Sequence, residues 1–89
     1  MSETEVRVSN RLGLHARAAA RFVHLASRFE CRISVFKDDS CVDGKSILGL
    51  LTLAACQGTR LRLTAEGRDE QAALDELGRL VAGRFGEDN

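Results

Sequence analysis

Two kinds of apolar periodicity alternate along this chain, and their order constrains the fold more than any other feature of its 89 residues. In three segments apolar and polar residues alternate, which predicts strands with one buried face, and a turn at 37–40 predicts a fourth, short strand. Between them lie segments with the apolar spacing or the apolar density of helices. The predicted strands are 5–9, 31–36, 41–42 and 60–65, and the predicted helices are 16–27, 47–55 and the segment between Asp69 and Gly83.

This order of elements, β-α-β-β-α-β-α, favours one architecture. Four short strands and crossing helices predict an α+β fold, an open-faced sandwich in which a four-stranded antiparallel sheet carries three helices on one face. A chain of this length has room for a single core, so we expect residues 1–89 to form one domain.

The charge balance and composition argue against two classes of partner. Lys and Arg number 13 and so do Asp and Glu, so no net positive field favours nucleic acid or an anionic membrane surface. Trp and Tyr are absent, which removes the usual stacking platforms for single-stranded nucleic acid. No apolar run is long enough to span a membrane, and the polar start of the chain lacks the features of a signal peptide. We therefore expect a cytoplasmic protein without nucleic-acid or membrane partners.

The strongest chemical signal lies at residues 13–17, which read GLHAR. Gly13 favours a turn, and a helix that begins at Ala16 would place His15 at its N-terminus, where unpaired N–H groups and the helix dipole bind phosphate. A neutral imidazole is a nucleophile that can form a covalent intermediate, and Arg17 adds a fixed cation. The segment therefore predicts that His15 can hold a phosphoryl group. His24, in mid-helix without such surroundings, is expected to be structural or exposed.

A second signal is Ser46, which precedes the most apolar predicted helix. It suits the N-cap position, and a cap hydroxyl can also be phosphorylated. The neighbouring sequence is not a nucleotide-binding P-loop, because Asp39 stands where that motif needs its first glycine. The apolar side chains at 47–53 are too continuous for one buried stripe, so we expect some in the core and some on a docking surface. The cysteines at 31, 41 and 56 lack metal-site or disulfide spacing and are expected to be reduced thiols.

Together, the segments 13–17 (GLHAR) and 44–50 (GKSILGL) resemble the HPr family, the histidine-containing phosphocarriers of the bacterial phosphotransferase system. The similarity extends over nearly the whole chain, includes 65–74 (AEGRDEQAAL), and agrees with the predicted order of elements.

The resemblance implies a covalent phosphoryl carrier rather than an independent enzyme. His15 would accept a phosphoryl group from phosphorylated enzyme I and pass it to an enzyme IIA-type acceptor, while Arg17 and the backbone N–H groups of Ala16 and Arg17 contact the phosphoryl oxygens. Ser46 would be the position that a regulatory kinase modifies, and a phosphatase restores, in some bacteria. No metal or cofactor is implied, and a monomer is expected. The implied partner-docking residues are Ala20, Ile47, Leu48 and Leu51.

Two features of the chain differ from the usual family pattern. Ala18 stands where most members have proline, which fixes the backbone at a helix start. Arg11 and Leu12 precede the glycine as in the nitrogen-related branch, and the tail at 82–88 is also closer to that branch, whereas Lys45-Ser46-Ile47 is typical of kinase-regulated members. The sequence leaves the sugar-uptake and nitrogen-related branches open.

An alternative from another class of function is an HPr-like regulatory or interaction domain. Such a domain would bind partners through the helix at 47–53 without transferring phosphate. Binding by a protein that never becomes phosphorylated would distinguish it from a carrier.

Overall fold

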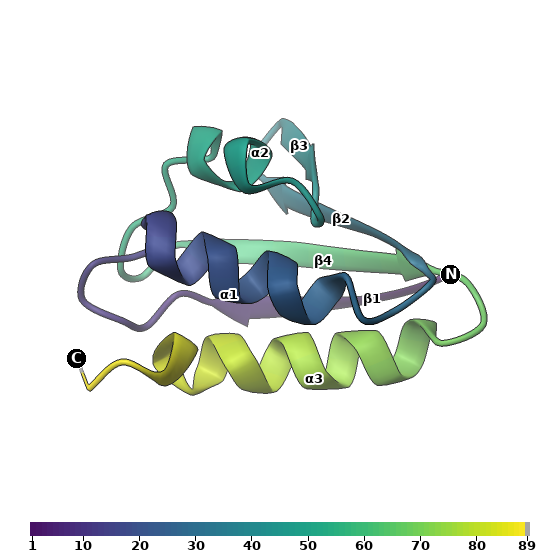
Figure 1. Ribbon diagram of the computed structural model, residues 1–89. Coiled ribbons are helices and arrows are strands. Elements are labelled where there is room, and N and C mark those ends of the chain that lie inside the picture. Colours follow the sequence, from purple (N-terminus) through teal and green to yellow (C-terminus); the bar gives the residue numbers. More distant parts are fainter. Residues whose placement is uncertain (89) are drawn as a thin grey trace.

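The computed structural model describes residues 1–88, which form a single four-stranded antiparallel sheet with the strand order β1-β4-β2-β3. Three helices cover one face of this sheet (Figure 1), so the predicted α+β fold is confirmed. In chain order the elements are β1 (Ser2–Arg7), α1 (Ala16–Ala26), β2 (Arg32–Lys37), β3 (Ser40–Asp43), α2 (Ile47–Thr52), β4 (Arg60–Glu66), α3 (Glu70–Ala82) and a 3-10 turn, η1 (Arg84–Gly86).

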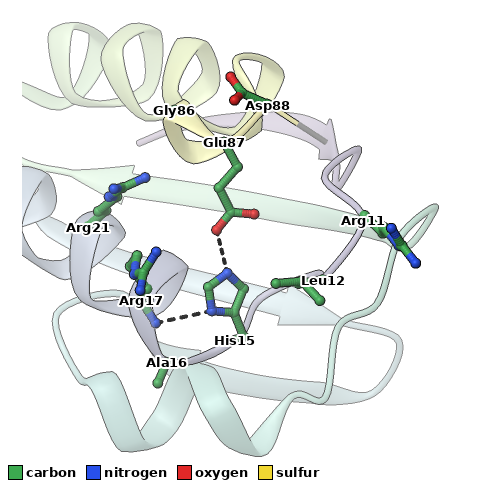
Figure 2. Close-up of a pocket in the computed structure, with 9 residues that line it drawn as sticks. All are labelled: Arg11, Leu12, His15, Ala16, Arg17, Arg21, Gly86, Glu87 and Asp88. Atoms are coloured by element: carbon green, nitrogen blue, oxygen red, sulfur yellow. Dashed lines mark hydrogen bonds and ion pairs between the residues drawn. The ribbon is translucent and has the colours of Figure 1, made fainter.

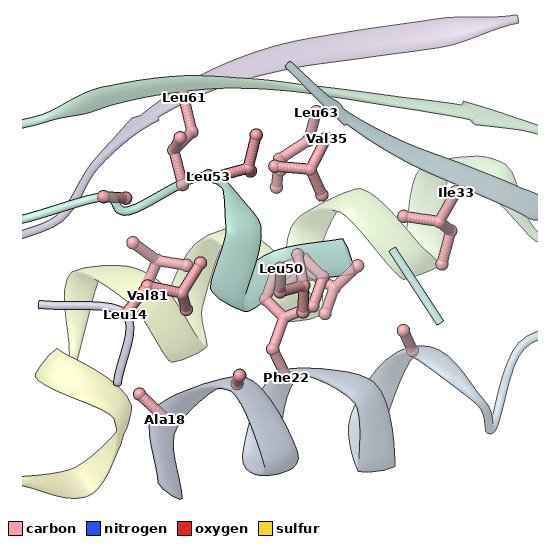
Figure 3. Close-up of a cluster of buried hydrophobic side chains, with 14 of the residues drawn as sticks. Leu14, Ala18, Phe22, Ile33, Val35, Leu50, Leu53, Leu61, Leu63 and Val81 are labelled. Atoms are coloured by element: carbon pink, nitrogen blue, oxygen red, sulfur yellow. The ribbon is translucent and has the colours of Figure 1, made fainter. Parts of the chain in front are cut away.

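The core lies between the sheet and the helices. Alternate residues of the two central strands, Ile33 and Val35 on β2 and Leu61 and Leu63 on β4, point toward the helices and are buried. Figure 3 shows how Phe22 of α1 lies opposite them, with α2 alongside. Because successive strand residues point to opposite faces, this burial pattern fixes the register of the sheet against the helices. The core therefore holds the start of α1, and with it His15, in a fixed place.

Two boundaries differ from the sequence-based expectation, each for a local reason. β1 begins at Ser2 and ends at Arg7, because its first residues pair with β4 although they are polar and carry no alternating pattern. α2 ends at Thr52 and not at 55, because Ala54 adopts a positive φ of 51° and the Ala55 carbonyl accepts a hydrogen bond from the N–H of Leu14 at 2.9 Å. The second change brings the segment after α2 against the loop that leads to His15.

Asp69, the residue before α3, connects this helix to another part of the chain. Asp69 stands at the N-cap of α3, but its side chain makes no capping hydrogen bond. Its carboxylate instead accepts hydrogen bonds from the N–H groups of Glu30, at 2.9 Å, and Cys31, at 3.0 Å, and these bonds hold the pKa of Asp69 below its usual value. Asp69 therefore joins the start of α3 to the loop between α1 and β2.

The 3-10 turn after α3 was not predicted from the sequence. Arg84 and Phe85 both adopt positive φ angles, 58° and 55°, and the Phe85 side chain is buried. This turn follows the end of α3, and Glu87, just beyond it, points toward His15 at the N-terminus of α1 (Figure 2).

Candidate functional site

His15 occupies the N-cap position of α1, as the sequence predicted for the start of this helix. Its extended backbone (φ −79°, ψ 179°) follows Gly13, whose φ of 69° favours glycine. A Cβ at position 13 would lie 2.5 Å from the Ala55 carbonyl oxygen, so the loop can approach the segment after α2 only because residue 13 has no side chain. Leu14 is buried next to it. The loop therefore presents the His15 ring from a rigid backbone.

The two nitrogens of the His15 ring have different partners (Figure 2). Nδ1 faces the first turn of α1 and accepts a hydrogen bond from the N–H of Arg17 at 3.3 Å. Nε2 is hydrogen-bonded to the carboxylate of Glu87. Because Nδ1 accepts and a carboxylate can only accept, the ring's proton belongs on Nε2. Nδ1 is thus the nitrogen with a free electron pair, and it points toward the positive end of the helix dipole.

The ring lies in an open hollow between the loop, α1 and the C-terminal segment (Figure 2). Arg17 is exposed and stands beside the ring on the first turn of α1. Arg11 and Arg21 add two further guanidinium groups to the lining, and Glu87 and Asp88 add two carboxylates. The hollow is lined by Arg11, Leu12, His15, Ala16, Arg17, Arg21, Gly86, Glu87 and Asp88. It is therefore an open site with a nucleophile, a helix N-terminus and cations, suited to an anion carried by a second protein.

Three residues of this site were missed by the sequence analysis. The Asn10 amide is buried and donates hydrogen bonds to the Gly13 carbonyl, at 2.7 Å, and to Oε1 of Glu87, at 2.9 Å. The hydrogen bonds from Asn10 and then from His15 hold the pKa of Glu87 below its usual value. The Arg21 guanidinium donates to the Phe85 carbonyl. No local pattern marks the contacts that Glu87 and Phe85 make, since these join residues far apart in the sequence.

Ser46 caps α2 as predicted, since its Oγ accepts a hydrogen bond from the N–H of Gly49 at 3.0 Å. The apolar residues that follow are divided between core and surface, as their continuous run suggested. Leu50 and Leu53 are buried, whereas Leu48 is 77% exposed. Ala20 is exposed on α1, which packs against α2. Ile47 and Leu51 are also exposed on α2, and Leu12 is exposed in the lining of the hollow.

The other candidate residues lie outside the hollow. His24 is exposed on α1. The three cysteines are unpaired thiols, of which Cys31 is buried. Within residues 1–88, no group of three or more His, Cys, Asp and Glu side chains has an arrangement that could hold a metal ion. None of the helices in this part of the chain is long and apolar enough to cross a membrane.

The fold and the site together define a class of protein. It is a small α+β open-faced sandwich that presents a histidine at the N-terminus of its first helix. Residues 2–83 match the model of the PTS-HPr family, described as the PTS HPr component phosphorylation site. The chain belongs to the HPr family of phosphocarrier proteins.

Individual relatives agree with this assignment. The chain is 49% identical over 88 residues to the phosphocarrier protein HPr of Pseudomonas aeruginosa, and 46% identical over 87 residues to that of Neisseria meningitidis, with 98% of each chain covered. A crystal structure of HPr from Thermoanaerobacter tengcongensis superimposes with a TM-score of 0.96, at 44% identity and with both chains fully covered.

Some of the similar structures are at odds with the expected monomer. An HPr dimer from Thermoanaerobacter tengcongensis, 45% identical, matches with a TM-score of 0.78 and covers 98% of this chain and 100% of its own. The monomer therefore stays a prediction for this chain.

Proposed function

We propose that this chain, acting as one unit over residues 1–89, carries a phosphoryl group on His15 between phosphorylated enzyme I and an enzyme IIA-type acceptor. The observation that carries this proposal is the environment of the His15 ring. Its unprotonated Nδ1 faces the N-terminus of α1 inside an open hollow rimmed by arginines. Membership of the HPr family supports the same conclusion.

The geometry suggests how transfer would proceed. The Nδ1 electron pair attacks the donor's phosphorus, and an N–P bond forms as the bond between phosphorus and the donor atom breaks, with its electron pair leaving on the donor. The N–H of Arg17, which makes only a 3.3 Å bond to Nδ1 in the free protein, is then available to a phosphoryl oxygen. The Arg17 guanidinium and the N–H of Ala16 would stabilise the remaining negative charge. Transfer to the acceptor is the reverse of this step, so the carrier needs no cofactor.

The exposed apolar surface of α2 and α1 would dock these partners. It consists of Ala20, Ile47, Leu48 and Leu51, and we call it the docking surface. A phosphoryl group on Ser46, at the edge of this surface, would place a dianion where docking removes water, so phosphorylation by a regulatory kinase would weaken docking.

The test is incubation with phosphoenolpyruvate and enzyme I, followed by intact-mass measurement. The wild-type protein should gain one acid-labile phosphoryl group. His15→Ala should gain none, and the matched control His24→Ala should be labelled like the wild type. Equal labelling of His15→Ala would overturn the proposal.

A second candidate function rests on the docking surface alone. An interaction domain without phosphoryl transfer would use the same exposed leucines, which do not depend on His15. The labelling experiment separates the two, because this candidate predicts partner binding by a wild-type protein that gains no phosphoryl group.

A further inference from the structure

We propose that Glu87 is a positioning residue for His15: its carboxylate accepts the Nε2 proton and thereby presents the unprotonated Nδ1 to the incoming phosphoryl group. The inference rests on the proposed function of His15 and deepens it. Glu87 lies beyond the family match, which ends at residue 83, and outside both sequence motifs.

The contact is part of a continuous chain of hydrogen bonds. The carboxylate of Glu87 uses one oxygen, Oε2, for His15 Nε2 and the other, Oε1, for the Asn10 amide at 2.9 Å. Asn10 is completely buried and its amide is held in turn by the Gly13 carbonyl at 2.7 Å. The same loop thus carries His15 and fixes the carboxylate that orients it. A carboxylate held on both oxygens has one orientation, which is what a positioning group requires.

The C-terminal segment is built to deliver this carboxylate. Phe85 is 1% exposed and inserts into the core next to the end of α3. Its carbonyl accepts a hydrogen bond from the Arg21 guanidinium on α1, and the N–H of Glu87 donates to the Arg84 carbonyl at 2.9 Å. Arg84 and Phe85 both have positive φ, which is unfavourable for side-chain-bearing residues and persists only where surrounding contacts determine it. Glu87 therefore follows a fixed turn and not a loose tail.

Glu87 lies where it can support phosphoryl transfer without blocking the site. Glu87 occupies the Nε2 side of the ring, whereas the hollow's cationic helix end lies on the Nδ1 side. The place for a phosphoryl group is left open. Once the N–P bond forms at Nδ1 with the proton still on Nε2, the ring carries positive charge, which the Glu87 carboxylate offsets. The neighbouring carboxylate of Asp88 also lines the hollow, but no hydrogen bond or ion pair joins it to His15 within residues 1–88.

The first measurement needs no phosphate. In the full-length protein labelled with 15N-histidine, nitrogen chemical shifts report which ring nitrogen carries the proton. The wild type should show His15 protonated on Nε2 at neutral pH. Glu87→Gln preserves size but supplies only one side-chain acceptor for two donors, Asn10 and His15, so the population protonated on Nδ1 should rise. Glu76→Gln makes the same substitution at an exposed position of α3 outside the hollow and should leave the shifts unchanged.

The second measurement is the rate of phosphoryl transfer from enzyme I. Glu87→Gln should slow the transfer about tenfold, the effect of losing one charge-assisted hydrogen bond in the transition state. Glu76→Gln should transfer at the wild-type rate. Unchanged shifts and an unchanged rate in Glu87→Gln would overturn the proposal, as would a loss of thermal stability without either change, since that outcome makes Glu87 only a structural contact. Labelling of the wild type on His15 tests the proposed function separately.

Discussion

Leu48 and Leu50 stand two residues apart on α2 and should respond in opposite ways to the same substitution. Leu48 is 77% exposed and Leu50 is fully buried. Leu48→Ala removes surface that already contacts water, so the free energy of unfolding should change by no more than about 0.5 kcal/mol. Leu50→Ala opens a cavity beneath α2 and should lower that free energy by about 2–5 kcal/mol.

The effects of the two substitutions on binding to enzyme I should have the reverse order, with Leu48→Ala the more harmful. Burying a whole leucine side chain stabilises a complex by about 1.5–3 kcal/mol. Roughly three quarters of Leu48 is exposed, so a partner that covers it gains about 1–2 kcal/mol of binding free energy. Truncation to alanine loses this gain and should raise the Kd for enzyme I about five- to thirtyfold.

Urea unfolding and calorimetric titration with enzyme I measure the two quantities. Leu50→Ala serves as the control. Titrated without urea, at a temperature where it is fully folded, it should bind enzyme I with a Kd close to that of the wild type. The reasoning would be refuted if Leu48→Ala bound enzyme I normally, because the docking surface would then lie elsewhere. Destabilisation by Leu48→Ala comparable to that by Leu50→Ala would equally refute it.

Three further perturbations test other parts of the account. Ser46→Asp keeps an N-cap side chain, so urea unfolding should stay within about 0.5 kcal/mol of wild type while transfer from enzyme I slows; unchanged transfer kinetics would remove the regulatory argument. Gly13→Ala forces a Cβ against the Ala55 carbonyl at a φ of 69°. The free energy of unfolding measured in urea should fall by at least about 2 kcal/mol, and phosphorylation should decrease. Wild-type stability would contradict the backbone argument. The pKa of Asp69 is lowered in the folded protein, so the ionised carboxylate stabilises the fold. This stabilisation is fully present above the ordinary pKa of 3.8 and is lost as pH falls through the lower pKa of the folded state. Asp69→Asn should therefore lower the melting temperature at neutral pH but not in strong acid, and a difference that persists in acid would show that the charge is not responsible.

The fold was largely predictable because its signals are local. Alternating residues on β2 and β4 and the spacing along α1 each arise within a few positions and agree with one another. β1 shows where this fails, since its polar start at Ser2 pairs with β4 through backbone groups that every residue has. The early end of α2 arises from a contact with the N–H of Leu14, which is remote in sequence.

The same distinction explains the site. The neighbours of His15 in the sequence are enough to place it at a helix N-terminus, and Ser46 is recognisable as a cap from its own surroundings. The partner of His15 Nε2 was not predictable, because Glu87 lies 72 positions away and reaches the ring through a turn at two residues that are not glycine. A buried Asn10 amide completes that contact, and turn-forming asparagines are too common to signal it.

The central claim is that one nitrogen of one histidine receives the phosphoryl group. NMR of 15N-histidine-labelled protein, incubated with phosphoenolpyruvate and enzyme I, identifies the phosphorylated ring and nitrogen through the phosphorus coupling. The account predicts phosphorus bonded to Nδ1 of His15, with Nε2 still protonated and His24 unchanged. Phosphorus on Nε2 of His15, or on His24, would contradict it.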